Sequence, residues 1–133
     1  MPSPLAGRRI LVVEDEMMVA LLLEDMLADL GCLVVGSVVC VEDALAMIDI
    51  LFLDAAVLDV NLGGQMSYPI ADALIAAGVP FIFSTGYAAN RLQEGYRTLP
   101  MLQKPYHRSE LADALAAILA LAPPAAATGD LAA

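Results

Sequence analysis

Basic side chains are scarce in this sequence. Its 133 residues include 6 Lys plus Arg against 16 Asp plus Glu, and the formal net charge at pH 7 is −10. Proteins bind nucleic acids largely by neutralising phosphates with lysine and arginine. We therefore expect no nucleic-acid partner for this chain.

Cysteine and long apolar runs are also scarce. Cys32 and Cys40 lack metal-ligand spacing, which favours small buried side chains in a reducing compartment. The longest apolar runs, such as 17–23, are far shorter than the roughly 18–20 residues that span a bilayer. Arg8 and Arg9 precede an apolar segment too short for a signal peptide. These absences predict a cytoplasmic protein without a membrane partner.

The composition is that of one globular domain. Hydrophobic residues make up 60% of the chain and charged residues 17%, enough apolar material for a core without disulfides. We place this domain at residues 8–122. Residues 1–7 are expected to form an N-terminal arm, and residues 123–133 a flexible C-terminal tail.

Short apolar runs alternate with longer helical stretches along the chain. This alternation predicts an α/β fold with a parallel sheet covered by helices on both faces. The expected strands are residues 10–13, 33–35, 55–60, 80–84 and 100–103. The expected helices are residues 16–30, 41–48, 69–77 and 109–121, with Ser109 as the N-cap of the last one and a glycine-containing loop at 61–64.

Polar side chains stand at the carboxyl ends of four expected strands. Glu14 and Asp15 follow the first strand, Asp59 lies near the end of the third, and Thr85 and Lys104 follow the fourth and fifth. These ends share one edge of a parallel sheet, which is where ligands of open α/β sheets bind. Each residue alone has a structural explanation, as a helix-dipole partner or a turn residue. Their joint placement favours a site.

The carboxylates at this edge are suited to a hard divalent cation. Asp15 and Asp59 would supply oxygens to Mg²⁺, the backbone carbonyl of Asn61 a third, and Glu14 would act through water. A free oxygen of Asp59 could then attack a phosphoryl group in line and form an acyl phosphate.

Two further side chains suit the phosphoryl group itself. Lys104 would place its ammonium on one phosphoryl oxygen, and the Thr85 hydroxyl would donate to another. We therefore assign a catalytic role to Asp59 as phosphoacceptor, assisted by Thr85 and Lys104.

With these residues in place, the chain resembles the receiver domain of two-component response regulators over residues 8–121. The matching parts are Glu14-Asp15, Asp59 in the segment 57–61, Thr85, and Lys104-Pro105. The resemblance implies a (βα)5 flavodoxin-like/CheY-like fold with a five-stranded parallel sheet of order 2-1-3-4-5. It also implies phosphate transfer from a histidine to Asp59, a cis peptide before Pro105, and no conventional enzymatic turnover.

The segment 80–87, Pro-Phe-Ile-Phe-Ser-Thr-Gly-Tyr, resembles the motif of the FAT GUY single-domain regulators of alphaproteobacterial stress signalling. Ser84 stands where that motif usually has Ala. Many receivers carry a switching aromatic residue where this chain has Met101, so we expect the output signal to travel through the loop after Thr85, with Tyr87. Gly86, Asn90 and Gly95 predict a short or irregular fourth helix.

The first helix carries more apolar residues than a core-facing stripe needs. Val19, Leu22, Leu23, Met26 and Leu30 have the spacing of such a stripe. Met17, Met18 and Leu21 lie partly off it, beside the acidic residues. They form either part of a wide buried face or an adaptable docking surface for a histidine kinase or phosphotransfer protein.

The sequence thus predicts a single-domain response regulator, monomeric or weakly dimeric, that accepts phosphate in a phosphorelay. It would signal through an unidentified protein partner or act as a phosphate sink. One alternative is a receiver-like binding module that works without phosphorylation. Another is an aspartyl-phosphate phosphatase of the haloacid-dehalogenase type, against which count Asn61 and the absence of an acidic pair after Lys104.

Overall fold

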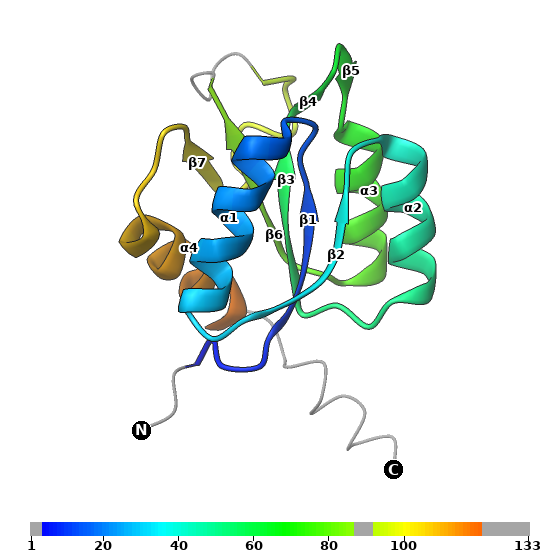
Figure 1. Cartoon of the computed structure of the whole chain (residues 1–133). Coiled ribbons are helices and arrows are strands. Elements are labelled where there is room, and N and C mark those ends of the chain that lie inside the picture. The colour runs from blue at the N-terminus through cyan, green and yellow to red at the C-terminus, as the bar shows by residue number, and fades with distance from the viewer. Residues whose placement is uncertain (1–3, 87–91, 121–133) are drawn as a thin grey trace.

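Five parallel strands form the centre of the molecule (Figure 1). The computed structural model describes residues 4–86 and 92–120. The strands of the sheet are β2 (Leu33–Val38), β1 (Arg9–Val13), β3 (Ala55–Asp59), β6 (Phe81–Thr85) and β7 (Met101–Gln103), in this spatial order. Among the parallel strands alone this is the order 2-1-3-4-5, which confirms the fold that the resemblance implied.

In the described residues, four helices cover the sheet. They are α1 (Met17–Asp29), α2 (Val41–Ile50), α3 (Tyr68–Ala77) and α4 (Arg108–Ala120). Helices α1 and α4 lie on one face, and α2 and α3 on the other (Figure 1). Ala44 of α2 and Leu74 of α3 belong to the core on one face, and Leu27 of α1 and Leu111 of α4 to the core on the other. The continuous apolar sequence of the central strands follows from this coverage, because both of their faces are buried.

The structure replaces the loop expected at residues 61–64 with a hairpin. Strands β4 (Asn61–Leu62) and β5 (Gln65–Met66) pair antiparallel across Gly63 and Gly64. Both glycines have positive φ, 63° and 95°, as the two central residues of a type I′ hairpin turn must have. The expected glycine-containing loop did not include this strand pairing, which the tight turn at the two adjacent glycines permits.

The expected N-cap at Ser109 was wrong. Helix α4 begins at Arg108, so Ser109 lies inside its first turn. The backbone N–H of His107 donates to Glu110 Oε1 at 2.9 Å, and the His107 carbonyl accepts from the Leu111 N–H at 3.1 Å. The Glu110 carboxylate therefore reaches back as in a capping box, which moves the start of the helix upstream.

The buried stripe of α1 agrees with the expected one except at Leu22. Leu23 is buried and Met26 and Leu30 pack against the core, as expected, and Ala20 and Leu27 are buried as well, whereas Leu22 is 56% exposed. Residues 17–23 are all apolar, so periodicity could not determine whether Ala20 or Leu22 lies beside Leu23 in the buried stripe. Leu22 thus joins the exposed side of α1.

The connection between β6 and β7 contains no helix in its described part, residue 86 and residues 92–100. The expectation of a short or irregular fourth helix agrees with these residues. Tyr87 and Asn90 lie outside the described residues. Among the helices of the described chain, none has the length and hydropathy of a membrane span.

Candidate functional site

A cleft of about 370 Å³ opens at the carboxyl ends of the central strands. Glu14 lies buried beside it, just after β1. All the other residues assigned from the sequence line the cleft, together with Glu16 and three glycines; the lining is Asp15, Glu16, Asp59, Asn61, Gly63, Gly64, Thr85, Gly86 and Lys104. The parallel topology therefore brings the predicted residues together.

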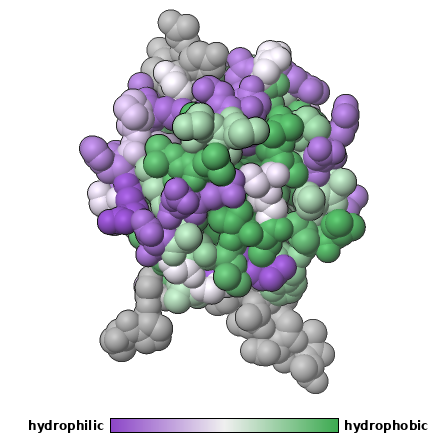
Figure 2. Space-filling view, viewed as in Figure 1, coloured by the Kyte–Doolittle hydropathy of each residue, from purple (hydrophilic) through white to green (hydrophobic). Residues whose placement is uncertain are grey.

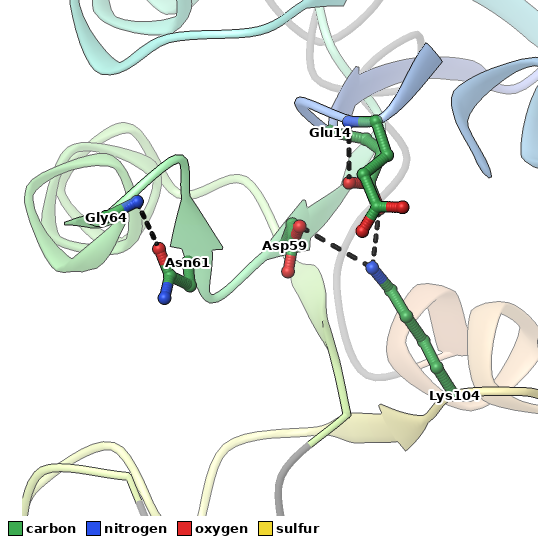
Figure 3. A network of polar contacts seen from close by, with 6 residues as sticks. Glu14, Asp59, Asn61, Gly64 and Lys104 are labelled. Carbon is green, nitrogen blue, oxygen red and sulfur yellow. Dashed lines mark hydrogen bonds and ion pairs between the residues drawn. The ribbon is translucent and has the colours of Figure 1, made fainter. Parts of the chain in front are cut away.

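The centre of the site is an ionic network of two carboxylates and one ammonium group (Figure 3). Lys104 Nζ lies 2.7 Å from Glu14 Oε1 and 3.5 Å from Asp59 Oδ2. Glu14 and Asp59 are 2% and 8% exposed. Burial makes these charges costly unless they are paired, and Lys104 can pair both because it reaches in from the end of β7.

Asp59 has a strongly perturbed carboxyl group. Burial and a hydrogen bond to Glu14 raise its pKa to about 7, and the charge of Lys104 and the backbone N–H of Asn61 oppose this rise. Without a further cation, Asp59 therefore holds a proton over much of the range below neutral pH. A cation in the cleft would favour the carboxylate form.

Glu14 and Lys104 are shifted in the opposite sense, toward their charged forms. Burial acts to raise the pKa of Glu14, but hydrogen bonds with Asp59 and Lys104 outweigh it and hold the pKa below its usual value. Burial likewise acts to lower the pKa of Lys104, and its bond to Glu14 and the charge of Asp59 raise it instead. The Glu14–Lys104 pair is therefore ionised.

The three carboxylates fit a metal ion. Glu14, Asp15 and Asp59 each offer an oxygen within 4.8 Å of the others, and Asp15 is exposed to solvent. Three carboxylates and the single ammonium of Lys104 leave two formal negative charges, the complement of a divalent cation. Oxygen ligands with room for water are typical of Mg²⁺ sites.

Backbone contacts fix the relative positions of the strands that carry the site. Asp59 pairs in register with Ser84, and the Val60 N–H donates to the Ser84 carbonyl at 3.3 Å. The Lys104 N–H donates to the Thr85 carbonyl at 2.8 Å. The Lys104–Pro105 peptide is cis, as the resemblance implied.

The sequence reasoning missed the wall formed by the hairpin. A Cβ on Gly63 would lie 3.5 Å from Asp15 Oδ2, so this glycine packs directly beside the acidic group. Asn61 Oδ1 accepts from the Gly64 N–H at 2.7 Å, which turns the Asn61 amide into the hairpin. The two adjacent glycines could have predicted this hairpin from the sequence. A hairpin directly after the end of β3 narrows the entrance to the cleft.

Several solved structures similar to this chain are receiver proteins. The solution structure of SdrG from Sphingomonas melonis Fr1 is 46% identical, covers 85% of this chain and 97% of its own, and has a TM-score of 0.76. SdrG has also been solved in a BeF3-activated conformation. The receiver (REC) domain of the Erythrobacter litoralis response regulator PhyR is 26% identical over 88% and 93% of the two chains, with a TM-score of 0.77.

A further relative contains a metal. The receiver domain of the sensor histidine kinase PA1611 from Pseudomonas aeruginosa PAO1 has magnesium in its active-site cleft. It is 28% identical over 86% of this chain and 99% of its own, with a TM-score of 0.73. No family model and no curated protein matches the chain. The fold, the site and the identity to SdrG together show that the chain belongs to the response-regulator receiver domains of two-component signalling.

Proposed function

We propose that this receiver domain accepts a phosphoryl group on Asp59 from a phosphohistidine of a histidine kinase or phosphotransfer protein. The observation that carries the proposal is the buried Asp59 carboxyl at the floor of an open cleft, 3.5 Å from the Lys104 ammonium. In the transfer, an Asp59 oxygen forms a bond to phosphorus while the bond from phosphorus to the histidine nitrogen breaks. The products are an acyl phosphate and a neutral imidazole.

The other residues of the cleft would serve the same step. Lys104 would exchange part of its contact with Glu14 for a phosphoryl oxygen, and the Thr85 hydroxyl would donate to a second one. Glu14, Asp15, Asp59 and the Asn61 carbonyl are the residues we assign to Mg²⁺. Bound there, Mg²⁺ would offset the repulsion between the carboxylates and the incoming phosphoryl oxygens.

An apolar surface beside the cleft supports a protein as phosphate donor. On α1, Met17 and Met18 are 75% and 78% exposed, and Leu21 and Leu22 are about half exposed. Figure 2 shows apolar side chains gathered on the face that α1 occupies in Figure 1. Exposed apolar patches of this kind mark interaction sites.

This surface continues into a groove that reaches the site. The groove, of about 150 Å³, lies between α1 and the turn after β7, and Val19, Met26, Pro105 and Tyr106 contribute to its lining. Lys104 lines both the groove and the cleft. A helix of the donor that packs along α1 would therefore bring its phosphohistidine to the mouth of the cleft.

We place the domain as a single-domain regulator that passes its signal to a protein partner or drains phosphate from a shared kinase. The similarity to SdrG and to the receiver domain of PhyR supports a regulator of this kind. The role in stress signalling that the FAT GUY motif implied stays a prediction, as do the cytoplasmic location, the monomeric or weakly dimeric state and the domain limits at 8–122.

The proposal is tested by incubating the domain with Mg²⁺ and a phosphorylated histidine kinase and measuring its intact mass. We expect the wild type to gain one phosphoryl group and Asp59→Asn to gain none. Asp49→Asn is the matched control, because Asp49 is an exposed carboxylate on α2 away from the cleft.

Two results would overturn this function. If no kinase transfers phosphate to a folded domain that also fails to bind Mg²⁺, the alternative of a phosphorylation-independent binding module is favoured. If the domain instead hydrolyses a general phosphomonoester with turnover that requires Asp59, the phosphatase alternative is favoured.

A further inference from the structure

Aromatic side chains hold the connection between β6 and β7 against helix α3. The rings of Tyr68 and Tyr96 stack with centroids 4.3 Å apart and an angle of 23°. Phe83 of β6 meets both rings edge-on, at 6.3 Å from Tyr68 and 6.4 Å from Tyr96. Offset stacks and edge-to-face pairs are the favoured geometries of aromatic contacts.

Hydrogen bonds reinforce the aromatic contacts. The Tyr68 hydroxyl accepts from the backbone N–H of Gln93 at 3.0 Å. The Tyr96 hydroxyl donates to Asp72 Oδ1 at 2.8 Å, and this bond raises the pKa of Tyr96. Asp72 lies one helical turn after Tyr68, so both bonds start from the same face of α3. We call Tyr68, Asp72, Gln93 and Tyr96 the aromatic clasp.

The clasp substitutes for helical packing in this part of the chain. In residues 92–100, which contain no helix, Leu92 is 1% exposed and belongs to the core beside Phe83 and Leu74. Arg97 Nε donates to the Leu92 carbonyl at 2.8 Å. Within the segment, the Tyr96 N–H donates to the Gln93 carbonyl at 3.1 Å and the Leu99 N–H to the Tyr96 carbonyl at 3.2 Å. These bonds are local, so the attachment of the segment to α3 depends on the clasp, and the loss of a clasp contact should weaken it.

The clasp lies next to two elements that form walls of the cleft. Tyr68 follows the hairpin that lines the cleft, since β5 ends at Met66 and the Ser67 N–H donates to the Val60 carbonyl at 2.8 Å. Phe83 lies two residues before Thr85 on β6. A change at Asp59 that acts on the hairpin would thus reach Tyr68 along the chain, and one that acts on the end of β6 would reach both tyrosine rings through Phe83.

The beginning of α3 is not fixed by an N-cap. Ser67 occupies the cap position but makes no side-chain cap bond, and its buried hydroxyl has no hydrogen-bond partner among the described residues. N-cap hydroxyls normally accept from an N–H of the first turn. The first turn of α3, which carries Tyr68, therefore lacks one of the usual restraints on its position.

We propose that the aromatic clasp is the conformational switch of this receiver, and that occupation of Asp59 by a phosphoryl group loosens residues 92–99 from α3. This inference rests on the proposed phosphoacceptor function. The phosphoryl group would contact Thr85 and the hairpin, and these contacts exist only in the phosphorylated state. They would favour a position of β6 and α3 that differs from the one the clasp stabilises in the free domain. Residues 92–99 then become the surface that the downstream partner distinguishes.

The test is amide hydrogen exchange of residues 92–99 with Mg²⁺, in the presence and absence of beryllofluoride as the phosphoryl probe. We expect exchange in the wild type to become at least threefold faster when beryllofluoride is bound. Tyr96→Phe removes the donor and Asp72→Ala removes the acceptor of the hydroxyl–carboxylate bond, and we expect exchange about tenfold faster already without beryllofluoride. Asp49→Ala, which removes an exposed carboxylate on α2, should exchange as the wild type does.

Fluorine NMR of bound beryllofluoride separates the two possible failures. If bound fluoride signals are seen while residues 92–99 exchange at the same rate in both states, the clasp inference is overturned and the acceptor function stands. Variants that exchange like the wild type would also overturn it. If no bound signal is seen in the wild type, the acceptor function fails and the clasp inference falls with it.

Discussion

Glu14 and Met17 are three residues apart, yet they belong to surfaces of opposite character. Glu14 is 2% exposed and forms an ion pair inside the molecule, whereas Met17 is an apolar side chain that is 75% exposed. The cleft holds the charges of Glu14 and Asp59 on side chains that are largely buried, and the exposed face of α1 leaves apolar surface in water. Neither arrangement favours the stability of the free domain.

The difference indicates that the cleft and the exposed face of α1 serve different steps of phosphoryl transfer. The carboxylates of the cleft repel each other, and a bound cation lowers this repulsion and prepares the cleft for a phosphoryl group. This chemistry does not depend on which protein donates the phosphoryl group. Exposed methionines gain from burial against a protein and adapt to its shape, so the face of α1 is suited to selecting the donor. Changes in one region should therefore leave the function of the other intact.

The largest effect should come from charge on the face of α1. We expect Met17→Glu combined with Met18→Glu to slow transfer from a kinase on the order of a hundredfold, because two docking contacts are lost and carboxylates are buried in their place. Transfer from acetyl phosphate, which needs no docking surface, should remain within about twofold. Intact-mass time courses with both donors measure the two rates.

A control for added charge is available on the far side of the domain. Ile50→Glu combined with Ile75→Glu adds the same charge at two exposed helix positions of α2 and α3. This variant should accept phosphate from the kinase at the wild-type rate. Equal slowing by both double variants would indicate a general effect of net charge, and the division between the two regions would be wrong.

Inside the cleft, the second prediction concerns stability and pH. The folded-state pKa of Asp59 is raised from 3.8 to about 7, so its contribution to stability is fully present below pH 4 and lost as the pH rises through 7. Asp59→Asn removes the ionisation. We expect it to stabilise the metal-free domain by about 2 kcal/mol at pH 8, with a Tm higher by roughly 6–10 °C, and to have little effect at pH 4.

Thermal unfolding in EDTA at pH 4, 6 and 8 measures this effect. The lowered pKa of Glu14 acts in the opposite sense, because its contribution is present above the ordinary pKa of a glutamate and is lost as the pH falls through the lowered one. It therefore does not change between pH 6 and pH 8. A wild type and Asp59→Asn that unfold at the same temperature at pH 8 would contradict the raised pKa.

Most of the site could be predicted from sequence because it depends on topology. Once residues 10–13 and 55–60 are taken as parallel strands, the side chains at their ends must share one edge of the sheet, and Glu14 and Asp59 are brought together. The pairing of Lys104 with Glu14 at 2.7 Å was not predicted. This pairing depends on the conformation of the flexible lysine side chain and on whether a cation is bound. The amino-acid sequence determines neither by a local pattern.

The errors in the fold arose where several local arrangements suit the same residues. The apolar run 17–23 permits either Ala20 or Leu22 beside Leu23 in the buried stripe of α1, and tertiary packing buries Ala20 and leaves Leu22 exposed. The clasp was missed because Tyr68 and Tyr96 are 28 positions apart, and no periodicity relates them. Contacts of this kind follow from tertiary packing, which overrides local preference.

The smallest predicted effect tests whether proton and metal compete in the cleft. A cation must displace the proton from Asp59, so the affinity for Mg²⁺ should rise about tenfold between pH 6 and pH 8, through the pKa of about 7. Calorimetric titrations in buffers of different ionisation enthalpy should show release of a fraction of a proton that declines over this interval. Asp59→Asn should bind Mg²⁺ more weakly and without this pH dependence, whereas the double methionine variant on α1 should bind like the wild type. A flat affinity in the wild type would mean that Asp59 is already ionised at pH 6, and the charge in the cleft would then have to be balanced by Lys104 alone.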